Sequence, residues 1–173
     1  MKTALLSLST LLAGAVVALP AMAQGPTDPQ IAAIVVAANQ ADINNGRLAV
    51  RQGHDTQVKA FARQMITDHS AVNAAAVKLV TKLHVTPEAN ATSKQLTDGG
   101  VANVKALTPL RGAAFDKAYI ANEVAYHQAV IDAIDKTLIP SAQNAELKAL
   151  LVQSRPAFVA HLEHAKQIQA SLK

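Results

Sequence analysis

Apolar residues recur at alternating spacings of three and four along four long segments, the pattern of helices that pack in a bundle. The second segment shows it well, with apolar residues at positions 58, 62, 65, 72, 76, 79 and 83. Breaks rich in glycine, proline and helix-capping residues separate the four segments. The pattern and the breaks together predict helices over residues 29–52, 55–84, 113–138 and 144–172.

The segment between the second and third helices has a different character. Residues 88–110 contain capping residues, turn residues and the pair Gly99-Gly100. We predict two short helical pieces here, broken at the two glycines, because glycine is a poor helix former. The whole pattern therefore predicts an all-α, up-down four-helix bundle, ferritin-like, with a longer helical crossover between helices two and three.

The N-terminal segment 1–23 has the features of a secretory signal peptide. Lys2 supplies a positive start, a mostly apolar run follows over residues 4–19, and Ala21-Met22-Ala23 forms a small-x-small cleavage site. The apolar run is shorter than the roughly 20 residues that a membrane span needs. We therefore predict cleavage after Ala23, a periplasmic or secreted location, and one four-helix domain over residues 24–173.

Composition excludes several function classes. The formal charge of +4 falls to +3 once Lys2 is removed, and the chain has only five aromatic residues. A nucleic-acid partner is not expected, because such proteins carry basic grooves with aromatic platforms. No segment after the signal peptide is apolar enough over sufficient length to span a membrane, and the chain has no cysteine, which excludes disulfides.

Each predicted helix carries polar residues on the face that should be buried. His69, His127 and His161 stand at apolar positions of helices two, three and four, and Asp42 and Asn45 interrupt helix one. A buried polar group without a partner costs a few kcal/mol, on the order of 1–3 in proteins. These side chains should therefore satisfy one another, a trapped water or a bound ion.

A metal site in the bundle core is one reading of these residues, because facing helices build such sites. Imidazole together with carboxylate suits zinc, copper, iron or nickel. The candidate ligands are His69, His127, His161, Glu123, His164 and Asp42. The other reading is a polar layer in which the histidines only form hydrogen bonds with their neighbours. The residue pattern leaves both open.

The levels of these residues along the bundle follow from the helical rise of about 1.5 Å per residue. Counted from the predicted turn between helices three and four, His127 and His161 are offset by about six residues, or about 9 Å. Asp68, next to His69, is expected to face solvent because consecutive helical residues point about 100° apart. The chain has no Glu-x-x-His pair, which disfavours a ferritin-type oxidase, and we assign no catalytic residue.

Three blocks of the sequence resemble a known family. They are "VKAFARQMITDHSAVN" (58–73), "PLRGAAFDKAYIANEVAYHQAVI" (109–131) and "LKALLVQSRPAFVAHLEHAKQI" (147–168). They are similar to the ferritin-like domain of exported bacterial proteins called domain of unknown function 4142, whose members are often labelled outer-membrane proteins. The resemblance implies a four-helix ferritin-like fold and export, and it implies no catalytic residue.

The sequence thus leaves two main hypotheses of function. In the first, an exported bundle binds a transition metal or a small ligand through its inward-facing histidines. In the second, the protein is a non-enzymatic envelope protein with a structural or stress-related role, and its core histidines are only structural. An enzyme is the less favoured class.

Overall fold

The computed structural model describes residues 25–172. The signal peptide predicted over residues 1–23 lies outside this range. The elements, in chain order, are α1 (Asp28–Gln52), α2 (Thr56–Lys82), α3 (Ala91–Leu107), α4 (Gly112–Ala133), the π-helix η1 (Ile134–Leu138), α5 (Ile139–Ser141) and α6 (Ala145–Ser171). The described residues contain helices and no strand, which confirms the predicted all-α class.

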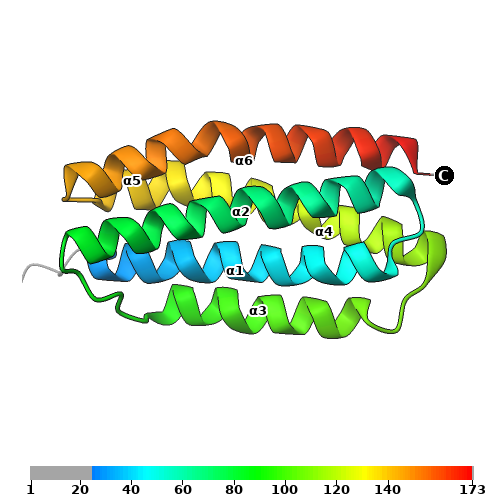
Figure 1. The fold of residues 1–173 in the computed structure, drawn as a ribbon, viewed down its shortest axis with the longest axis horizontal. Coiled ribbons are helices and arrows are strands. Elements are labelled where there is room, and N and C mark those ends of the chain that lie inside the picture. The colour runs from blue at the N-terminus through cyan, green and yellow to red at the C-terminus, as the bar shows by residue number, and fades with distance from the viewer. Residues whose placement is uncertain (1–24, 173) are drawn as a thin grey trace, which may run out of the picture.

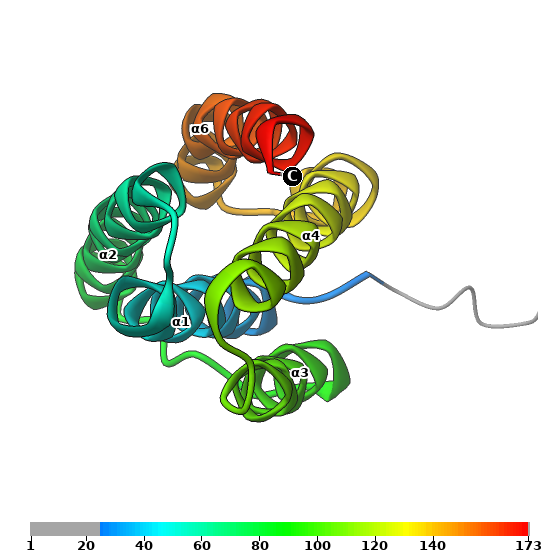
Figure 2. The ribbon, with the colours of Figure 1, turned by 90° about the vertical axis from the view of Figure 1, so that its right-hand side faces the viewer.

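Helices α1, α2, α4 and α6 form a four-helix bundle, and α3 packs on its outside against α1 (Figures 1 and 2). The short connections make α1 antiparallel to α2, and α4 antiparallel to α6. The crossover α3 carries the chain back along the length of the bundle, so α2 and α4 run in the same direction (Figure 1). One long crossover is also the connectivity of ferritin-like bundles. The ferritin-like assignment itself stays a prediction.

The crossover differs from the prediction of two short helical pieces, which is wrong. Residues 91–107 form one continuous α-helix that passes through both glycines. The reason is close packing: a Cβ atom added to Gly100 would lie 2.7 Å from the Cβ atom of Ala41 and 3.2 Å from its Cα atom. Gly100 thus lets α3 approach α1, and the cost of glycine in a helix is offset by that contact.

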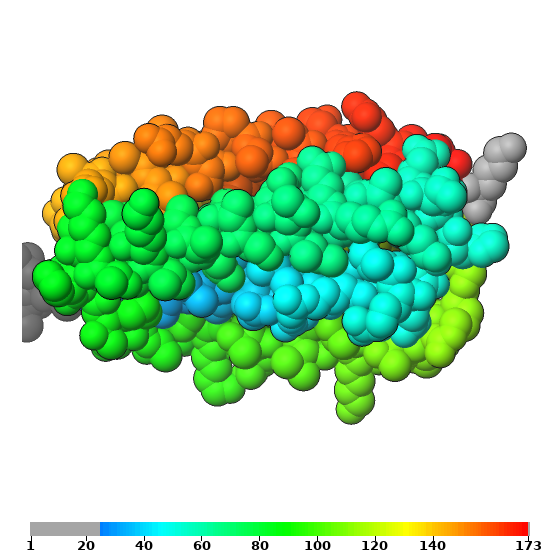
Figure 3. All heavy atoms as spheres, viewed as in Figure 1, coloured from blue at the N-terminus to red at the C-terminus, as the bar shows by residue number. Residues whose placement is uncertain are grey.

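Helix α1 has neighbours on most of its circumference. It lies between α2 and α3 on the face in Figure 3 and also contacts α4. Thirteen of its 25 residues are buried, compared with six of 27 in α2. This explains why its apolar pattern is less regular than that of the other helices. A helix that is covered on several sides has no single apolar stripe.

At each end of the bundle, an aspartate accepts hydrogen bonds from the backbone of a turn. Asp116 of α4 accepts hydrogen bonds from the backbone N–H groups of His54 (2.9 Å) and Asp55 (2.8 Å) between α1 and α2. At the other end, Asp28 accepts from the N–H groups of Gln143 and Asn144, both at 2.9 Å, before α6. Asp28 is the first residue of α1, so its carboxylate serves the neighbouring turn, whereas the N-cap of α1 is Thr27.

The apolar core has two halves with a polar layer between them. One half, near η1 and α5, includes Ile31, Ala76, Ile134 and Leu151. The other half, near the α1–α2 turn, includes Phe61, Tyr119 and Ile168. On α1, α2 and α4 the polar interruptions predicted from sequence lie between these two sets of positions, and on α6 His161 lies at the border, between Phe158 and Leu162 of the first half. None of the described helices combines the length and the apolar run needed to cross a membrane.

The two adjacent glycines of α3 provide a matched test of the crossover packing. A Cβ atom at Gly99 would meet no atom within 4 Å. We therefore expect Gly99→Ala to stabilise the protein by about 0.5–1 kcal/mol through helix propensity. Gly100→Ala should instead destabilise it by about 1–3 kcal/mol, because the methyl group meets Ala41 on α1. Urea unfolding followed by circular dichroism measures both, and equal effects of the two variants would contradict the packing described.

Candidate metal centre in the bundle core

All four bundle helices place a titratable side chain in the layer between the two core halves. Asp42 comes from α1, His69 from α2, Glu123 and His127 from α4, and His161 from α6. We call these five residues the central cluster. Each is at most 3% exposed. Their burial follows from their positions on the apolar seams, one or more per helix.

The three histidines of the central cluster lie against one another. The ring centroids are 5.5 Å apart for His69 and His127, 5.3 Å for His69 and His161, and 5.4 Å for His127 and His161. One ring nitrogen from each lies within 4.8 Å of the other two. Donor nitrogens around a tetrahedral zinc ion are about 3.4 Å apart. Inward shifts of up to about 0.8 Å would therefore bring the three rings around a single ion.

The outer nitrogen of His69 is held by Asn39 of α1. The Asn39 side-chain amide donates to the carbonyl oxygen of Val35 at 2.8 Å, so its own oxygen is left to accept. The Nδ1 atom of His69 lies 2.7 Å from this oxygen. His69 must therefore carry a proton on Nδ1, and its Nε2 atom faces the cluster.

The other two histidines are also oriented by a hydrogen bond from one ring nitrogen to an acceptor. The Nδ1 atom of His127 lies 3.0 Å from the carbonyl oxygen of Glu123, and Nε2 of His161 lies 2.9 Å from a carboxylate oxygen of Asp68. Both partners are acceptors, so each of these nitrogens donates. Histidines that bind metals usually donate their second N–H to a carbonyl or carboxylate in this way, which fixes the tautomer.

The inner nitrogens of the three rings have no hydrogen-bond partner. These buried atoms are Nε2 of His69, Nε2 of His127 and Nδ1 of His161. Both carboxylate oxygens of Asp42 and Oε2 of Glu123 are buried and without a hydrogen bond as well. Buried polar atoms are nearly always paired in folded proteins. Six unpartnered atoms gathered in one layer therefore indicate a shared partner.

The carboxylate of Asp42 is the centre of these contacts. One of its oxygens lies 2.7 Å from Nε2 of His69 and 3.5 Å from Nε2 of His127. The shorter distance is a close polar contact, although neither of the two atoms has a hydrogen-bond partner. Oε2 of Glu123 lies 3.5 Å from Nδ1 of His127, the nitrogen that donates to the Glu123 carbonyl. Asp42, Glu123 and His127 also each offer one ligand atom within 4.8 Å of the other two, so they form a second possible set of ligands.

The two carboxyl groups differ in their protonation. Burial by itself would raise the pKa of Asp42, but His69 and His127 outweigh it and hold the pKa below its usual range. Burial raises the pKa of Glu123 well above its usual range, and the charge on Asp42 adds to the effect. Near neutral pH the pair therefore carries one negative charge, on Asp42, and Glu123 keeps its proton.

Two of the three histidines, His127 and His161, are neutral near neutral pH. Burial lowers the pKa of His127 to about 4, against the opposing effect of Asp42. Burial also lowers the pKa of His161, although its bond to Asp68 acts in the opposite direction. Neutral imidazole is the form that binds a metal ion. At neutral pH the layer thus presents the neutral nitrogens of His127 and His161 and the carboxylate of Asp42.

Not every candidate from the sequence belongs to the central cluster. Five of the six lie together, and His164 does not, because its ring packs edge-on against Phe61 with centroids 5.3 Å apart. Asn45 also lies elsewhere, where its side-chain oxygen accepts from Asn103 of the crossover at 3.1 Å. The spacing of one helical turn between His161 and His164 therefore does not bring both side chains into the site.

Two residues of the site were missed or misplaced by the sequence reasoning. Asp68 was expected to face solvent, and this is wrong in part, since its side chain is 39% exposed yet pairs with His161 on α6. Asn39 was not singled out, although it stands one helical turn before Ile43 and close to Asp42 on the buried side of α1. An asparagine four residues after the apolar Val35 and three before Asp42 was the available signal.

The predicted level offset of about 9 Å between His127 and His161 is also wrong. The turn between α4 and α6 comes later in the chain than predicted, because η1 and α5 continue the helical path to Ser141, and α6 begins only at Ala145. Counted from these observed helix ends, the levels of His127 and His161 differ by only about two residues, or about 3 Å. This small offset agrees with the contact between the two rings.

Fold and site together define an all-α bundle with a buried layer of histidines and carboxylates. A family model described as "Domain of unknown function (DUF4142)" matches residues 13–168. The chain therefore belongs to the DUF4142 family, as the resemblance of its three blocks predicted. No curated protein and no solved structure matches the chain.

The low pKa of His127 makes stability depend on pH in a definite direction. The unfolded chain binds a proton at His127 near pH 6.5 and the folded protein only near pH 4. The contribution of neutral His127 to the free energy of unfolding is on the order of 3 kcal/mol. It is fully present above pH 6.5 and is lost as the pH falls to 4.

We expect the difference in unfolding free energy between the metal-free wild type and His127→Gln to shrink over this pH window. Urea unfolding in the presence of a chelator measures it. His54→Gln, at an exposed turn position, serves as the control, and its free energy of unfolding should depend on pH as that of the wild type does. A difference that stays constant with pH would show that His127 is not buried in its neutral form.

Proposed function

We propose that this protein is an exported metal-binding protein that holds a first-row transition metal ion in the core of its bundle. One observation carries the proposal. Three buried histidines each donate one ring N–H to a fixed acceptor and leave the other nitrogen unpartnered toward the same layer. A purely structural layer would satisfy these nitrogens by hydrogen bonds within the layer, yet Nε2 of His127 and Nδ1 of His161 make none, and Nε2 of His69 has only its 2.7 Å contact with Asp42.

The ligand set favours particular ions. Three imidazoles with one or two carboxylates suit zinc, copper, iron or nickel, whereas magnesium and calcium prefer oxygen ligands alone. The charge also fits a divalent cation, because Asp42 and a deprotonated Glu123 would supply two negative charges. The primary ligands we propose are His69, His127, His161 and Asp42, with Glu123 as a further ligand; His164 is excluded by its place against Phe61.

The exported location rests on the sequence of residues 1–23. The positive start, the apolar run and the Ala21-Met22-Ala23 site support cleavage and a periplasmic or secreted protein. The metal ions available to the protein would then be those of the periplasm or the exterior. The alternative is an envelope protein in which the central cluster shares protons only.

Elemental analysis of protein purified without an affinity tag tests metal binding. We expect about one metal ion per chain, or uptake of one on adding zinc, copper, nickel or iron to chelator-treated protein. His69→Gln, His127→Gln and His161→Gln should each lower affinity at least tenfold, since each removes one ligand. His54→Gln is the matched control, with an exposed imidazole on the same chain, and should bind as the wild type does.

The opposite result supports the structural alternative. A protein that is purified without metal, and whose melting temperature ignores all four added ions, does not bind metal in its core. Any ion that binds the folded state alone must raise the melting temperature. Circular dichroism of each glutamine variant shows whether a loss of metal reflects loss of the fold.

Proton release gives a separate test of the role of Glu123. Its pKa is raised well above the usual range, so it is protonated at pH 7 without metal. A bound cation should displace that proton, because ligands bind in their deprotonated form. Calorimetric titration in buffers of different ionisation enthalpy should count one proton fewer for Glu123→Gln than for the wild type. Equal proton counts would mean that Glu123 is not a ligand.

A further inference from the structure

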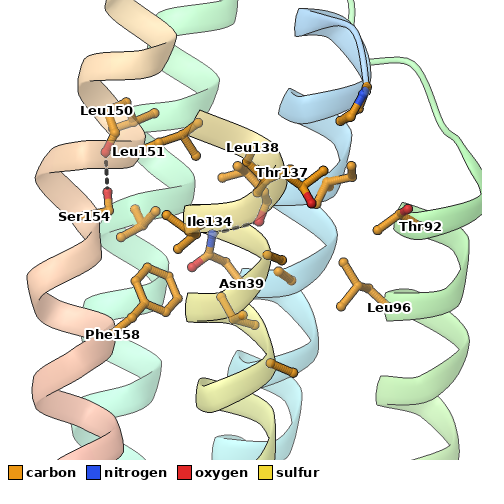
Figure 4. Close-up of a pocket in the computed structure, with 18 of the residues that line it drawn as sticks. Asn39, Thr92, Leu96, Ile134, Thr137, Leu138, Leu150, Leu151, Ser154 and Phe158 are labelled. Carbon is orange, nitrogen blue, oxygen red and sulfur yellow. Dashed lines mark hydrogen bonds between the residues drawn. The ribbon is translucent and has the colours of Figure 1, made fainter. Parts of the chain in front are cut away.

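The bundle contains an apolar cavity beside the central cluster. It has a volume of about 290 Å³ and lies at the end of the bundle near η1 and α5, between α1, α4 and α6 (Figure 4). Phe158 and Asn39 form the part of its wall that adjoins the histidines, with the Phe158 ring 5.1 Å from that of His69. Thr92, Leu96 and Thr137 line the side toward the crossover (Figure 4).

The wall of the cavity selects for an uncharged ligand. None of the described residues that line it carries a charged side chain. Its inner polar groups are already engaged, since the Tyr126 hydroxyl donates to the carbonyl oxygen of Ala38 and the Ser154 hydroxyl to that of Leu150, both at 2.8 Å. Only the exposed Thr92 and Thr137 remain, at the mouth, to meet a polar group of a ligand.

A π-helix forms one wall of this cavity. Three of the five residues of η1 line it, namely Ile134, Thr137 and Leu138. A π-helical turn is rare, is less favourable than a regular α-helical turn, and occurs frequently at functional sites. Here the extra residue widens the helix beside the cavity. This local departure from the α-helix keeps open a space that continuous α-helical packing would tend to fill.

The volume sets the size of the ligand. An apolar cavity of about 150 Å³ accepts benzene, which has six heavy atoms. By the same ratio this cavity accepts roughly ten to twelve heavy atoms. We propose that it binds a neutral, largely hydrocarbon molecule of this size, with any hydroxyl group directed toward Thr92 and Thr137. The proposal does not depend on a bound metal.

A homologous series of straight-chain primary alcohols tests the cavity on the purified, metal-free protein. Calorimetry or the shift in melting temperature gives the affinity for each alcohol from butan-1-ol to dodecan-1-ol. Affinity should rise about fourfold for each added methylene group and stop rising when the cavity is full, near nine to eleven carbons. Octanoate should bind at least tenfold more weakly than octan-1-ol, because the wall offers no cation. A rise without a plateau, or equal binding of octanoate, would overturn the proposal.

A pair of matched alanine variants locates the binding. Ala133→Leu adds bulk to the wall beside η1, and Ala75→Leu adds the same group to an exposed position on α2. Ala133→Leu should weaken binding of nonan-1-ol at least tenfold and move the plateau to shorter chains. Ala75→Leu should bind as the wild type does. If both bind as the wild type does, the alcohols occupy another place and the inference is wrong.

Two further measurements keep the test decisive. If circular dichroism shows that Ala133→Leu does not fold, Val130→Phe, at a half-buried position of the same wall, replaces it, with the same expected loss. In amide NMR spectra, octan-1-ol should shift the signals of Asn39, Ile134 and Leu151. Shifts confined instead to Val77 and Ala91, which line a separate open groove between α1, α2 and α3, would contradict the assignment.

Discussion

The burial of the Asp42 carboxylate governs the arrangement of this bundle. An isolated charge in an apolar core is strongly unfavourable unless opposite charge or hydrogen bonds compensate it. Asp42 is fully buried, and its oxygens meet two imidazoles and no backbone N–H group. Glu123 must stay protonated as long as Asp42 is ionised and no cation is bound. A proton or a metal ion in this layer would relieve the same constraint.

The polar layer and the apolar cavity share a wall, and this links the two sites that we infer. Asn39 orients His69 with one end of its amide and lines the cavity with the rest of its side chain. Phe158 separates the cavity from all three imidazole rings, at centroid distances of 5.1 to 6.3 Å. An occupant of the cavity would therefore rest against the residues that position the candidate ligands.

Much of this architecture could be predicted from the sequence. The three- and four-residue spacing revealed the four bundle helices, and the same spacing showed that His69, His127 and His161 face inward. The failures have two causes, which are contact between distant segments and a helix that continues past its predicted end. Gly100 is helical because Ala41 packs against it, and His127 lies level with His161 because η1 extends the helical path. Neither the contact nor the extension leaves a periodic signal in the chain.

The sequence by itself determined which helices form, which faces they bury, and that each buried face carries a polar interruption. Helical periodicity is a local property, so local spacing suffices to reveal it. Only the tertiary structure decided that five of the six candidates converge while His164 turns to Phe61. It also decided which nitrogen of each ring is free, because Asn39, Asp68 and the Glu123 carbonyl lie beside their histidines only after the helices have packed.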